Sequence, residues 1–292
     1  MSFSSKLKEE LSKTNNLNRK DQVYIELVGY LISSNVSIVR KKIRFSTESE
    51  YNINRFAKLL KNCDINDFKI DISGKKFFIE FKLPENFEGV GVDDKNIIAS
   101  DYGRSEMLDK AFVRGVFLGG GYMNNPENKY HFEININNAS NLKLLTDILS
   151  NYDISTKVLD KEKGCTLYIK EGEEISKILA FIGANSSVLK FEEVRVIRDS
   201  SNKLNRLVNC ETANFSKTIT AGKKQIEDIK FIKSKKKFGE LSEGLQEVAN
   251  IRLKYPEASL AELVGYMENT ISKSGLTHRL AAISKFAENL RK

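Results

Sequence analysis

Two stretches of the chain repeat one pattern of apolar and polar positions. Residues 43–65 and 132–154 align without a gap over 23 residues at an offset of 89. In each, an alternating run predicts a half-buried strand, and a following period near 3.6 residues predicts an amphipathic helix. Both copies end in the same pair, Asp64-Ile65 and Asp153-Ile154. The match indicates a duplicated structural unit.

The residues around each copy enlarge the unit. A hairpin centred on glycine follows each copy, at 68–82 around Gly74 and at 156–170 around Gly164. An apolar helix that contains glycine precedes each copy, at 25–34 and 111–119. We therefore expect helix, strand, strand, helix, strand, strand, twice over, with a closing helix near 173–182. This predicts a pseudo-twofold α+β domain whose two glycine-bearing helices meet at the axis.

The C-terminal stretch predicts a helix pair within residues 258–291. Ser259 and Glu262 have the spacing of a capping box, which marks a helix start. After a turn, apolar residues recur at spacings of 4, 3, 4 and 3, as one buried stripe: Leu276, Leu280, Ile283, Ala287 and Leu290. This pattern is typical of a helix-turn-helix, a small all-α module.

The polar face of the second helix is the candidate DNA-binding surface. We expect Ser274, Thr277 and His278 to meet base edges or nearby phosphates in the major groove. Lys273, Arg279 and Lys285 are expected to hold the phosphate backbone, which sets register but not sequence. The alternative is a helical cap that binds a protein or binds nothing.

Positive charge is concentrated just before this module. The chain carries a formal net charge of +8, and residues 195–237 hold 12 Lys/Arg against 4 Asp/Glu, so the rest sums to zero. Such a segment attracts phosphate without regard to sequence. The candidate backbone contacts are Arg198, Lys203, Arg206, Lys235, Lys236 and Lys237. Residues 233–237 are expected to form a flexible tether.

The run Asn205–Asn214 leaves two interpretations open. It is either a segment that contacts DNA or a partner, or a polar joint whose Asn and Thr side chains cap helix ends.

Composition narrows the class of protein. The opening residues are charged rather than apolar, and no apolar run approaches the roughly 18 residues that span a bilayer. Cys63, Cys165 and Cys210 are scattered and do not pair with His131 or His278 at zinc-ligand spacings. We expect a cytoplasmic protein without a disulfide framework, a metal or a cofactor.

The glycine-bearing helices resemble the LAGLIDADG motif of homing endonucleases. Aligned on the first glycine of the motif, the copies are residues 27–35 and 113–121. In that family the penultimate motif residue is an acid that holds metal ions over the scissile phosphates. Here those positions are Ser34 and Gly120, and the other motif acid is replaced by Ile32 and Leu118. The resemblance implies the nuclease fold without its metal ligands, so no catalytic residue is expected.

The other charged residues of this domain do not indicate that it binds DNA. Asp93, Asp94 and Asp101 lie elsewhere in the chain and have no assigned role. One strand of the first repeat carries Arg40, Lys41, Lys42 and Arg44, but its counterpart offers only Lys129, His131 and Glu133. Residues 1–190 carry 28 Lys/Arg against 26 Asp/Glu. We favour a protein-interaction or regulatory role for the domain.

Taken over its full length, the chain resembles the WhiA family of bacterial regulators. The stretches that carry this resemblance are residues 1–11, 109–121, 193–199, 205–214 and 272–280. The resemblance implies a cytoplasmic, nucleoid-associated protein that binds double-stranded DNA and lacks nuclease activity. It also implies a link to sporulation control, or to cell division and chromosome segregation, and a second regulator as partner.

The expected domains are two LAGLIDADG-like repeats at 1–95 and 96–190, a basic helical connector at 191–240, and the helix-turn-helix domain at 241–292. Two alternatives to a DNA-binding regulator stay open. One is an interaction protein that docks a sigma factor or another transcription factor, and the other is an active DNA endonuclease.

Overall fold

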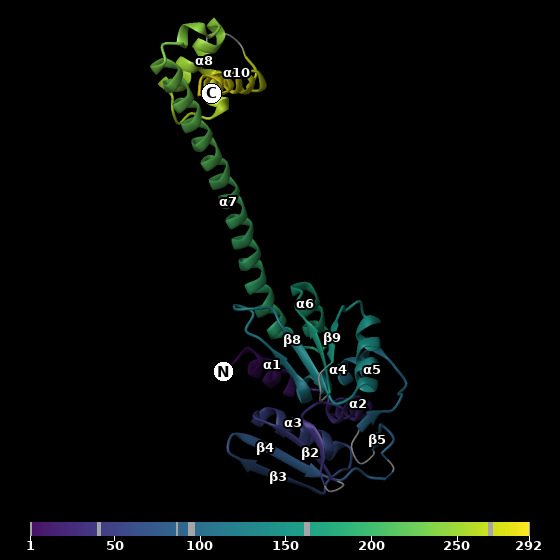
Figure 1. Ribbon diagram of the computed structural model, residues 1–292. Helices are drawn as coiled ribbons and strands as arrows, with labels where there is room; N and C mark the ends of the chain where they lie inside the picture. The colour runs from purple at the N-terminus through teal and green to yellow at the C-terminus, as the bar shows by residue number, and fades with distance from the viewer. Residues whose placement is uncertain are drawn as a thin grey trace. The chain divides into compact units, whose positions relative to one another are not determined.

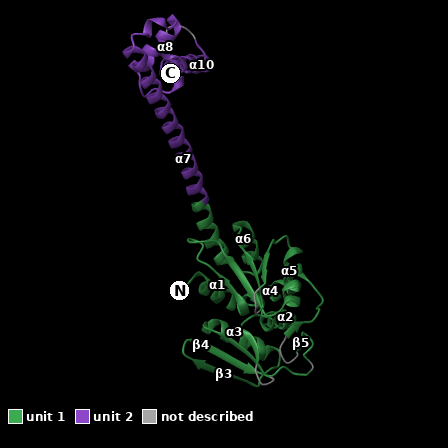
Figure 2. Ribbon diagram, viewed as in Figure 1, with its two compact units in different colours: residues 1–198 green, residues 199–292 purple. Residues whose placement is uncertain are grey.

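The computed structural model describes residues 2–39, 42–85, 87–92, 97–160, 164–267 and 271–291. The chain divides into two compact units, residues 1–198 and 199–292, and each is described by itself (Figure 2). Four residues considered above, Arg40, Lys41, Asp93 and Asp94, lie outside the described residues, as does the boundary expected between residues 95 and 96.

Unit 1 consists of two copies of one αββαββ arrangement (Figure 1). The first copy is α2 (Lys20–Leu31), β1 (Val36–Val39), β2 (Lys42–Thr47), α3 (Glu50–Asn62), β3 (Phe68–Ser73) and β4 (Lys76–Phe81). The second is α4 (Glu106–Gly120), β7 (Gly121–Met123), β8 (Phe132–Ile136), α5 (Ala139–Ser150), β9 (Lys157–Asp160) and β10 (Cys165–Ile169). Their antiparallel sheets have matching orders, β1-β2-β4-β3 and β7-β8-β10-β9. The predicted pseudo-twofold α+β fold is confirmed.

Further elements flank the two copies. Helix α1 (Phe3–Ser12) precedes the first copy, and α6 (Gly172–Phe181) follows the second, close to the closing helix that the sequence predicts. The strands β5 (Val90–Val92) and β6 (Ile97–Ala99) pair with each other in the segment between the copies. Within the described part of the chain, no helix is both long and apolar enough to cross a membrane.

The repeated Asp-Ile pair ends a helix in both copies. Asp64 and Asp153 adopt the left-handed backbone region, with φ of 60° and 54°. The next amide then turns back, so that Ile65 donates to the Leu60 carbonyl at 2.9 Å and Ile154 donates to the Leu149 carbonyl at 3.1 Å. Such bonds satisfy carbonyls that a helix end leaves without a partner. The side chain of each isoleucine is buried, so the pair also anchors the helix end to the core.

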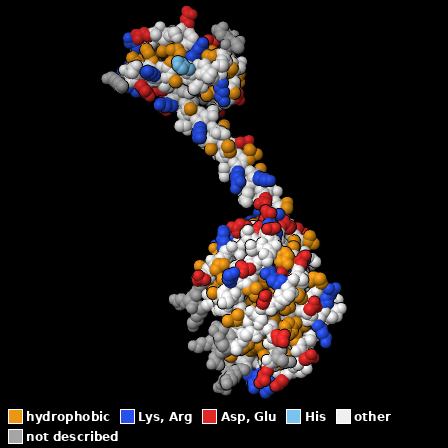
Figure 3. Space-filling view, turned by 90° about the vertical axis from the view of Figure 1, so that its right-hand side faces the viewer, with side chains coloured by type: hydrophobic (Ala, Val, Ile, Leu, Met, Phe, Trp, Pro, Cys, Tyr) orange, Lys and Arg blue, Asp and Glu red, His pale blue; other side chains and the backbone are white. Residues whose placement is uncertain are grey.

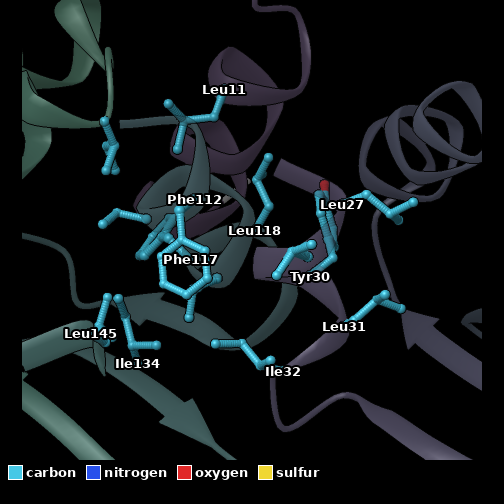
Figure 4. Close-up of a cluster of buried hydrophobic side chains, with 14 of the residues drawn as sticks. Leu11, Leu27, Tyr30, Leu31, Ile32, Phe112, Phe117, Leu118, Ile134 and Leu145 are labelled. Carbon is cyan, nitrogen blue, oxygen red and sulfur yellow. The ribbon is translucent and has the colours of Figure 1, made fainter. Parts of the chain in front are cut away.

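The apolar faces of the helices and sheets of unit 1 form one core. Figure 4 shows side chains of α2 and α4 meeting residues of the second sheet and of the neighbouring helices. The ring of Tyr30 packs edge-on against Phe45 at 5.4 Å, and its hydroxyl donates to the Asn52 side chain at 2.6 Å. On the α4 side, Phe117 stacks on Phe132 at 4.9 Å. The two copies therefore share a single hydrophobic interior.

Helices α2 and α4 touch backbone to backbone at their glycines. A Cβ built on Gly29 would lie 2.3 Å from the Phe112 carbonyl oxygen, and one on Gly115 would lie 2.1 Å from that of Glu26. No side chain fits at such distances, so only glycine permits this approach. The expectation that the two repeats meet at these glycines is confirmed.

A buried ion cluster joins the same two helices. The Glu26 carboxylate is fully buried and accepts from the Arg55 guanidinium at 2.9 Å and from the Arg114 guanidinium at 2.9 Å. Asn16 donates to it as well, at 3.1 Å. Burial alone would raise the pKa of Glu26, but the two guanidiniums outweigh it and hold this pKa below its ordinary value. Glu26 is therefore charged at neutral pH and fully bonded.

Unit 2 and the end of unit 1 share one helix, α7 (Asn185–Ser234). It is followed by a short 3-10 turn, η1 (Phe238–Glu240), and then by α8 (Glu243–Lys254), α9 (Leu260–Gly265) and α10 (Lys273–Arg291). The helix that contains the connector expected at 191–240 begins earlier, at Asn185. The unit boundary also falls inside the helix, at residue 198.

The segment 233–237 is not a flexible tether, and that expectation is wrong. The Lys235 backbone amide donates to the Phe231 carbonyl at 3.1 Å, and the Lys237 backbone amide donates to the Ile232 carbonyl at 3.2 Å, so the segment closes the helix. Ile229 and Ile232, one turn earlier, are fully buried in the core of unit 2. The packing of these residues fixes the end of α7.

We predict that Gly115→Ala destabilises the protein strongly. The added methyl group would collide with the Glu26 carbonyl oxygen, so the two central helices would have to separate. The expected loss is about 3 kcal/mol in the free energy of unfolding, measured by urea denaturation. Gly103→Ala is the matched control, because a Cβ there meets no atom within 4 Å. Equal stability of the two variants would contradict the close helix contact.

We also predict that Glu26→Gln destabilises the protein in a pH-dependent way. At pH 7 the variant leaves two buried guanidiniums without their anion, at a cost of about 3–5 kcal/mol. A carboxyl whose pKa is depressed by folding adds stability above its unfolded pKa and loses it as pH falls through the folded pKa. The gap between wild type and variant should therefore narrow below about pH 4. Asp147→Asn, in the exposed pair with Lys143, is the control and should show little change at any pH. A gap that stays constant down to pH 2 would contradict the assignment.

Candidate nucleic-acid interface

The helix-turn-helix predicted from the sequence is present in unit 2. The Glu262 amide donates to the Ser259 hydroxyl at 3.3 Å, and the Ser259 amide donates to the Glu262 carboxylate at 2.7 Å, which completes the capping box of α9. The Gly275 amide donates to the Ser272 hydroxyl at 3.1 Å at the start of α10. The predicted stripe lies in the core, where Leu276, Leu280, Ile283 and Ala287 are buried and Leu290 is half-buried.

The opposite face of α10 presents five of the six expected contacts to solvent: Lys273, Ser274, Thr277, His278 and Lys285. The Thr277 hydroxyl donates to the Lys273 carbonyl at 2.9 Å, and the Ser274 hydroxyl lies 2.9 Å from that of Ser272. Both hydroxyl oxygens keep a free lone pair as acceptors. In the described part of unit 2, the side chains of Lys273, His278 and Lys285 make no hydrogen bond or ion pair, so they are available to a ligand.

Two of the expected cations are used inside their own unit. Arg279 is half-buried, and its Nη1 lies 3.5 Å from the Gly244 carbonyl oxygen, where it helps to hold α10 against α8. Arg198 donates to the Pro126 carbonyl at 2.8 Å, with its guanidinium 4.6 Å from the Tyr130 ring centre. Contacts with DNA at either position would compete with these.

The remaining basic candidates lie at both ends of the unit 2 part of α7. Lys203 and Arg206 are exposed, and their side chains have no partner among the described residues. At the C-terminal end, Lys237 pairs with Glu240, and the Lys235 ammonium lies 5.7 Å from the Phe231 ring centre. Lys236 is exposed in a left-handed conformation with φ of 56°. Lys203, Arg206 and Lys236 are thus the free cations of this set.

Backbone groups lie close to both positions that correspond to the motif acids, Ser34 and Gly120. The Ser34 amide donates to the Asn135 carbonyl at 3.0 Å. A Cβ on Gly120 would lie 2.3 Å from that same carbonyl oxygen, so no acidic side chain fits there. The Asn35 amide group also donates to the Gly119 carbonyl at 2.6 Å, which ties the ends of α2 and α4 together. The space between the two motif acid positions is therefore closed by β8.

A polar cavity of about 590 Å³ adjoins these motif ends. It is lined by Asn35 and Gly121 together with the ammonium-bearing side chain of Lys8 from α1. Burial lowers the pKa of Lys8 to about 8, so it is still mostly protonated at neutral pH. Carboxylates also line the cavity, but the described residues include no group of three or more acids, His or Cys placed to hold a metal ion. A cation in this position opposes divalent metal binding.

The cations of the first sheet are partly neutralised. Lys42 forms an ion pair with Glu80 at 3.1 Å, and the Arg44 guanidinium lies 4.2 Å from the Phe78 ring centre. In the second sheet, His131 lies 3.0 Å from Glu133. Neither sheet offers a run of free cations among its described residues.

Comparison with known sequences identifies both parts of the chain. Residues 109–201 match the sequence profile of the WhiA LAGLIDADG-like domain, and residues 204–287 match that of the WhiA C-terminal HTH domain. A relative from Clostridium tetani named "Probable cell division protein WhiA" is 37% identical over an alignment of 317 residues, gaps included, that covers 100% of this chain and 99% of the relative. A relative of the same name from Clostridium novyi is 38% identical over 315 residues, with the same coverage.

Solved structures agree with this result. The crystal structure of full-length DUF199/WhiA from Thermatoga maritima superposes with a TM-score of 0.61 at 27% sequence identity, covering 99% of both chains. The N-terminal LAGLIDADG domain of DUF199/WhiA superposes with a TM-score of 0.52 at 26% identity, covering 62% of this chain and 92% of that one.

We predict that restoring the motif acids does not restore a nuclease. Gly120→Asp places a side chain where the Asn135 carbonyl lies, so we expect a marked fall in melting temperature. Ser34→Asp alone should be tolerated, because Ser34 is exposed. Neither variant nor their combination should nick supercoiled plasmid in the presence of magnesium. Magnesium-dependent cutting by the double variant would contradict the closed site.

Proposed function

Since the chain belongs to the WhiA family, we propose that it is a DNA-binding transcriptional regulator built on a catalytically inactive homing-endonuclease scaffold. The observation that carries the proposal is the exposed face of α10, opposite an apolar stripe whose first four residues are buried. A helix docked in this way presents its first turns to the major groove and its cations to the flanking phosphates. The ligand is double-stranded DNA.

Within that face we assign roles by chemistry. Ser274, Thr277 and His278 are proposed to meet base edges or nearby phosphates, since they lie in the first turns of α10 and combine donors with acceptors. Lys273 and Lys285 are proposed to bind phosphate. Arg279, at the edge of the face, holds α10 on α8 and reaches phosphate only if it releases Gly244.

The loss of nuclease activity is proposed from the residues themselves. Divalent cations of this class need carboxylate oxygens, and the two motif positions hold Ser34 and Gly120. The Asn135 carbonyl of β8, which lies close to both positions, and Lys8, which lines the adjoining cavity, support the same proposal.

The cellular process is proposed from the relatives. Those named above are called probable cell division proteins. We propose a role in cell division and chromosome segregation, or in sporulation control, exerted in the cytoplasm at the nucleoid.

A second candidate function has one observation in its favour. Leu204, Leu207 and Phe215 on α7 are 60%, 56% and 64% exposed, which is typical of a surface that binds a protein. The protein would then dock a sigma factor or a second regulator and bind DNA only weakly. A stable complex with such a regulator, together with no fragment-selective DNA binding, would favour this candidate.

We predict that the double variant Lys273→Ala, Lys285→Ala weakens DNA binding and its salt dependence. Each phosphate-binding cation removed should lower the slope of log affinity against log salt by about one unit. Electrophoretic mobility shifts on genomic duplex fragments at several salt concentrations measure this slope. Lys254→Ala removes an exposed charge at the end of α8 and serves as control. An unchanged slope in the double variant would remove α10 from the interface.

A further inference from the structure

Three parallel rows of side chains run along α7 within unit 2. Successive members of the first two rows are three or four residues apart, so each of these rows stays on one face, and the third row is a broader strip beside them. The first row holds amides and hydroxyls: Asn202, Asn205, Asn209, Thr212 and Ser216. The second holds three cations and two small residues: Lys203, Arg206, Cys210, Ala213 and Lys217. The third is mainly apolar: Leu204, Leu207, Val208, Glu211 and Phe215. The helix thus has an amide row, a cationic row and an apolar row.

The amide and cationic rows are exposed throughout, and among the described residues only Cys210 in these rows has a side-chain hydrogen bond, which it accepts from Asn214 at 3.8 Å. All ten residues lie at the surface, and Figure 3 shows Lys and Arg side chains standing free along this helix. Among the described residues, Asn205, Arg206 and Asn209 have no side-chain hydrogen bond, ion pair or ring contact. The interpretation of this run as a polar joint that caps helix ends therefore fails, because these residues lie in the interior of α7.

The Asn, Ser and Thr residues of the amide row are unfavourable in a helix whose surface contacts only water. Asn, Ser and Thr favour helices less than Ala, Glu or Lys do, because their side chains compete for backbone hydrogen bonds. A solvated helix usually gains support from Glu–Lys pairs four residues apart. Between residues 202 and 224, five Lys/Arg face a single acid, Glu211, and that acid lies in the apolar row. The two polar rows contain no acid at all.

This combination has the chemistry of a DNA-contacting face. Asn side chains donate to and accept from adenine in the major groove, and Arg and Lys bind phosphate on either side. The amide row spans about 21 Å from Asn202 to Ser216, which is well over half of one helical turn of B-DNA. Charge complementarity therefore selects a polyanion rather than a protein for these rows.

We propose that the amide and cationic rows of α7 form a second DNA-contacting face, with Asn205 and Asn209 at base edges and Lys203, Arg206 and Lys217 at phosphates. This inference rests on the proposed DNA-binding function and extends it beyond α10. The apolar row is excluded from this face because it continues into Gly222 and Ile229, which are buried against the rest of unit 2. The site of contact is the free stretch of α7 that precedes this packing.

The test uses the full-length protein and fluorescence anisotropy on two duplexes. One duplex is the fragment of the host genome that the wild-type protein retains best, and the other has random sequence. Asn205→Ala with Asn209→Ala should reduce the preference for the selected duplex by about tenfold and leave random-sequence affinity unchanged. Alanine strengthens a helix, so melting of α7 would not explain the loss. Arg206→Gln with Lys217→Gln should lower the salt slope by about two units on both duplexes.

Two controls separate the possible failures. Leu207→Ala changes the apolar row and should alter neither preference nor salt slope, so a loss there equal to that of the Asn variants would overturn the inference. The Lys273→Ala, Lys285→Ala variant reports on α10 alone. If it weakens binding while every α7 variant matches wild type, only this second face is refuted. If the wild-type protein binds neither duplex, the proposed DNA-binding function fails and this inference fails with it.

Discussion

The contact between α2 and α4 is the constraint on which unit 1 depends. With glycine at positions 29 and 115, the two helix backbones approach so closely that a carbonyl oxygen lies within 2.3 Å of where each Cβ would be. That approach leaves the Glu26 side chain inside the protein, where an unpaired carboxylate would cost several kcal/mol. Arg55 comes from the same repeat and Arg114 from the other, so neutralising Glu26 also fastens the two repeats together. The close helix packing and the charge pairing at Glu26 therefore depend on each other, and both hold the two repeats together.

The same closeness limits the room at the two positions that correspond to the motif acids. In a nuclease of this fold, two acids at the lower ends of the helix pair would need room for metal ions. Here the hydrogen bond from Asn35 to Gly119 joins the two helix ends, and that from Ser34 to Asn135 ties the end of α2 to β8. Gly120 is tolerated because it leaves space for the Asn135 carbonyl. Backbone and amide contacts therefore lie at the two positions where the LAGLIDADG motif carries acids.

The sequence predicted those features that depend on neighbours in the chain. The repeat was visible because strand and helix periods, hairpin glycines and the Asp-Ile pair all recur at one offset. The helix-turn-helix was visible from its capping box and one apolar stripe. The Glu26 cluster was missed because its arginines lie 29 and 88 residues away, and local periodicity carries no sign of such a partnership. The only local signal was a carboxylate inside an apolar helical run. The positions of Arg198 and Arg279 were likewise set by contacts with Pro126 and Gly244, which no spacing rule predicts.

Helix α7 shows that the arrangement of charged residues indicates a binding surface better than their concentration in the sequence does. The sequence marked residues 195–237 as basic, which predicted attraction to phosphate, with a flexible tether at residues 233–237. In the structure these basic residues have a regular arrangement, because amides, cations and apolar residues lie in separate rows along one helix. Each residue of a helix is rotated by about 100° from the one before it. The rows therefore keep a fixed direction relative to the buried Ile229 and Ile232 only if the helix is unbroken between them. A flexible linker of the same composition would carry the same net charge and could not hold Asn205 and Asn209 on one face. Because α7 is continuous, its amides and cations lie on defined faces of one helix.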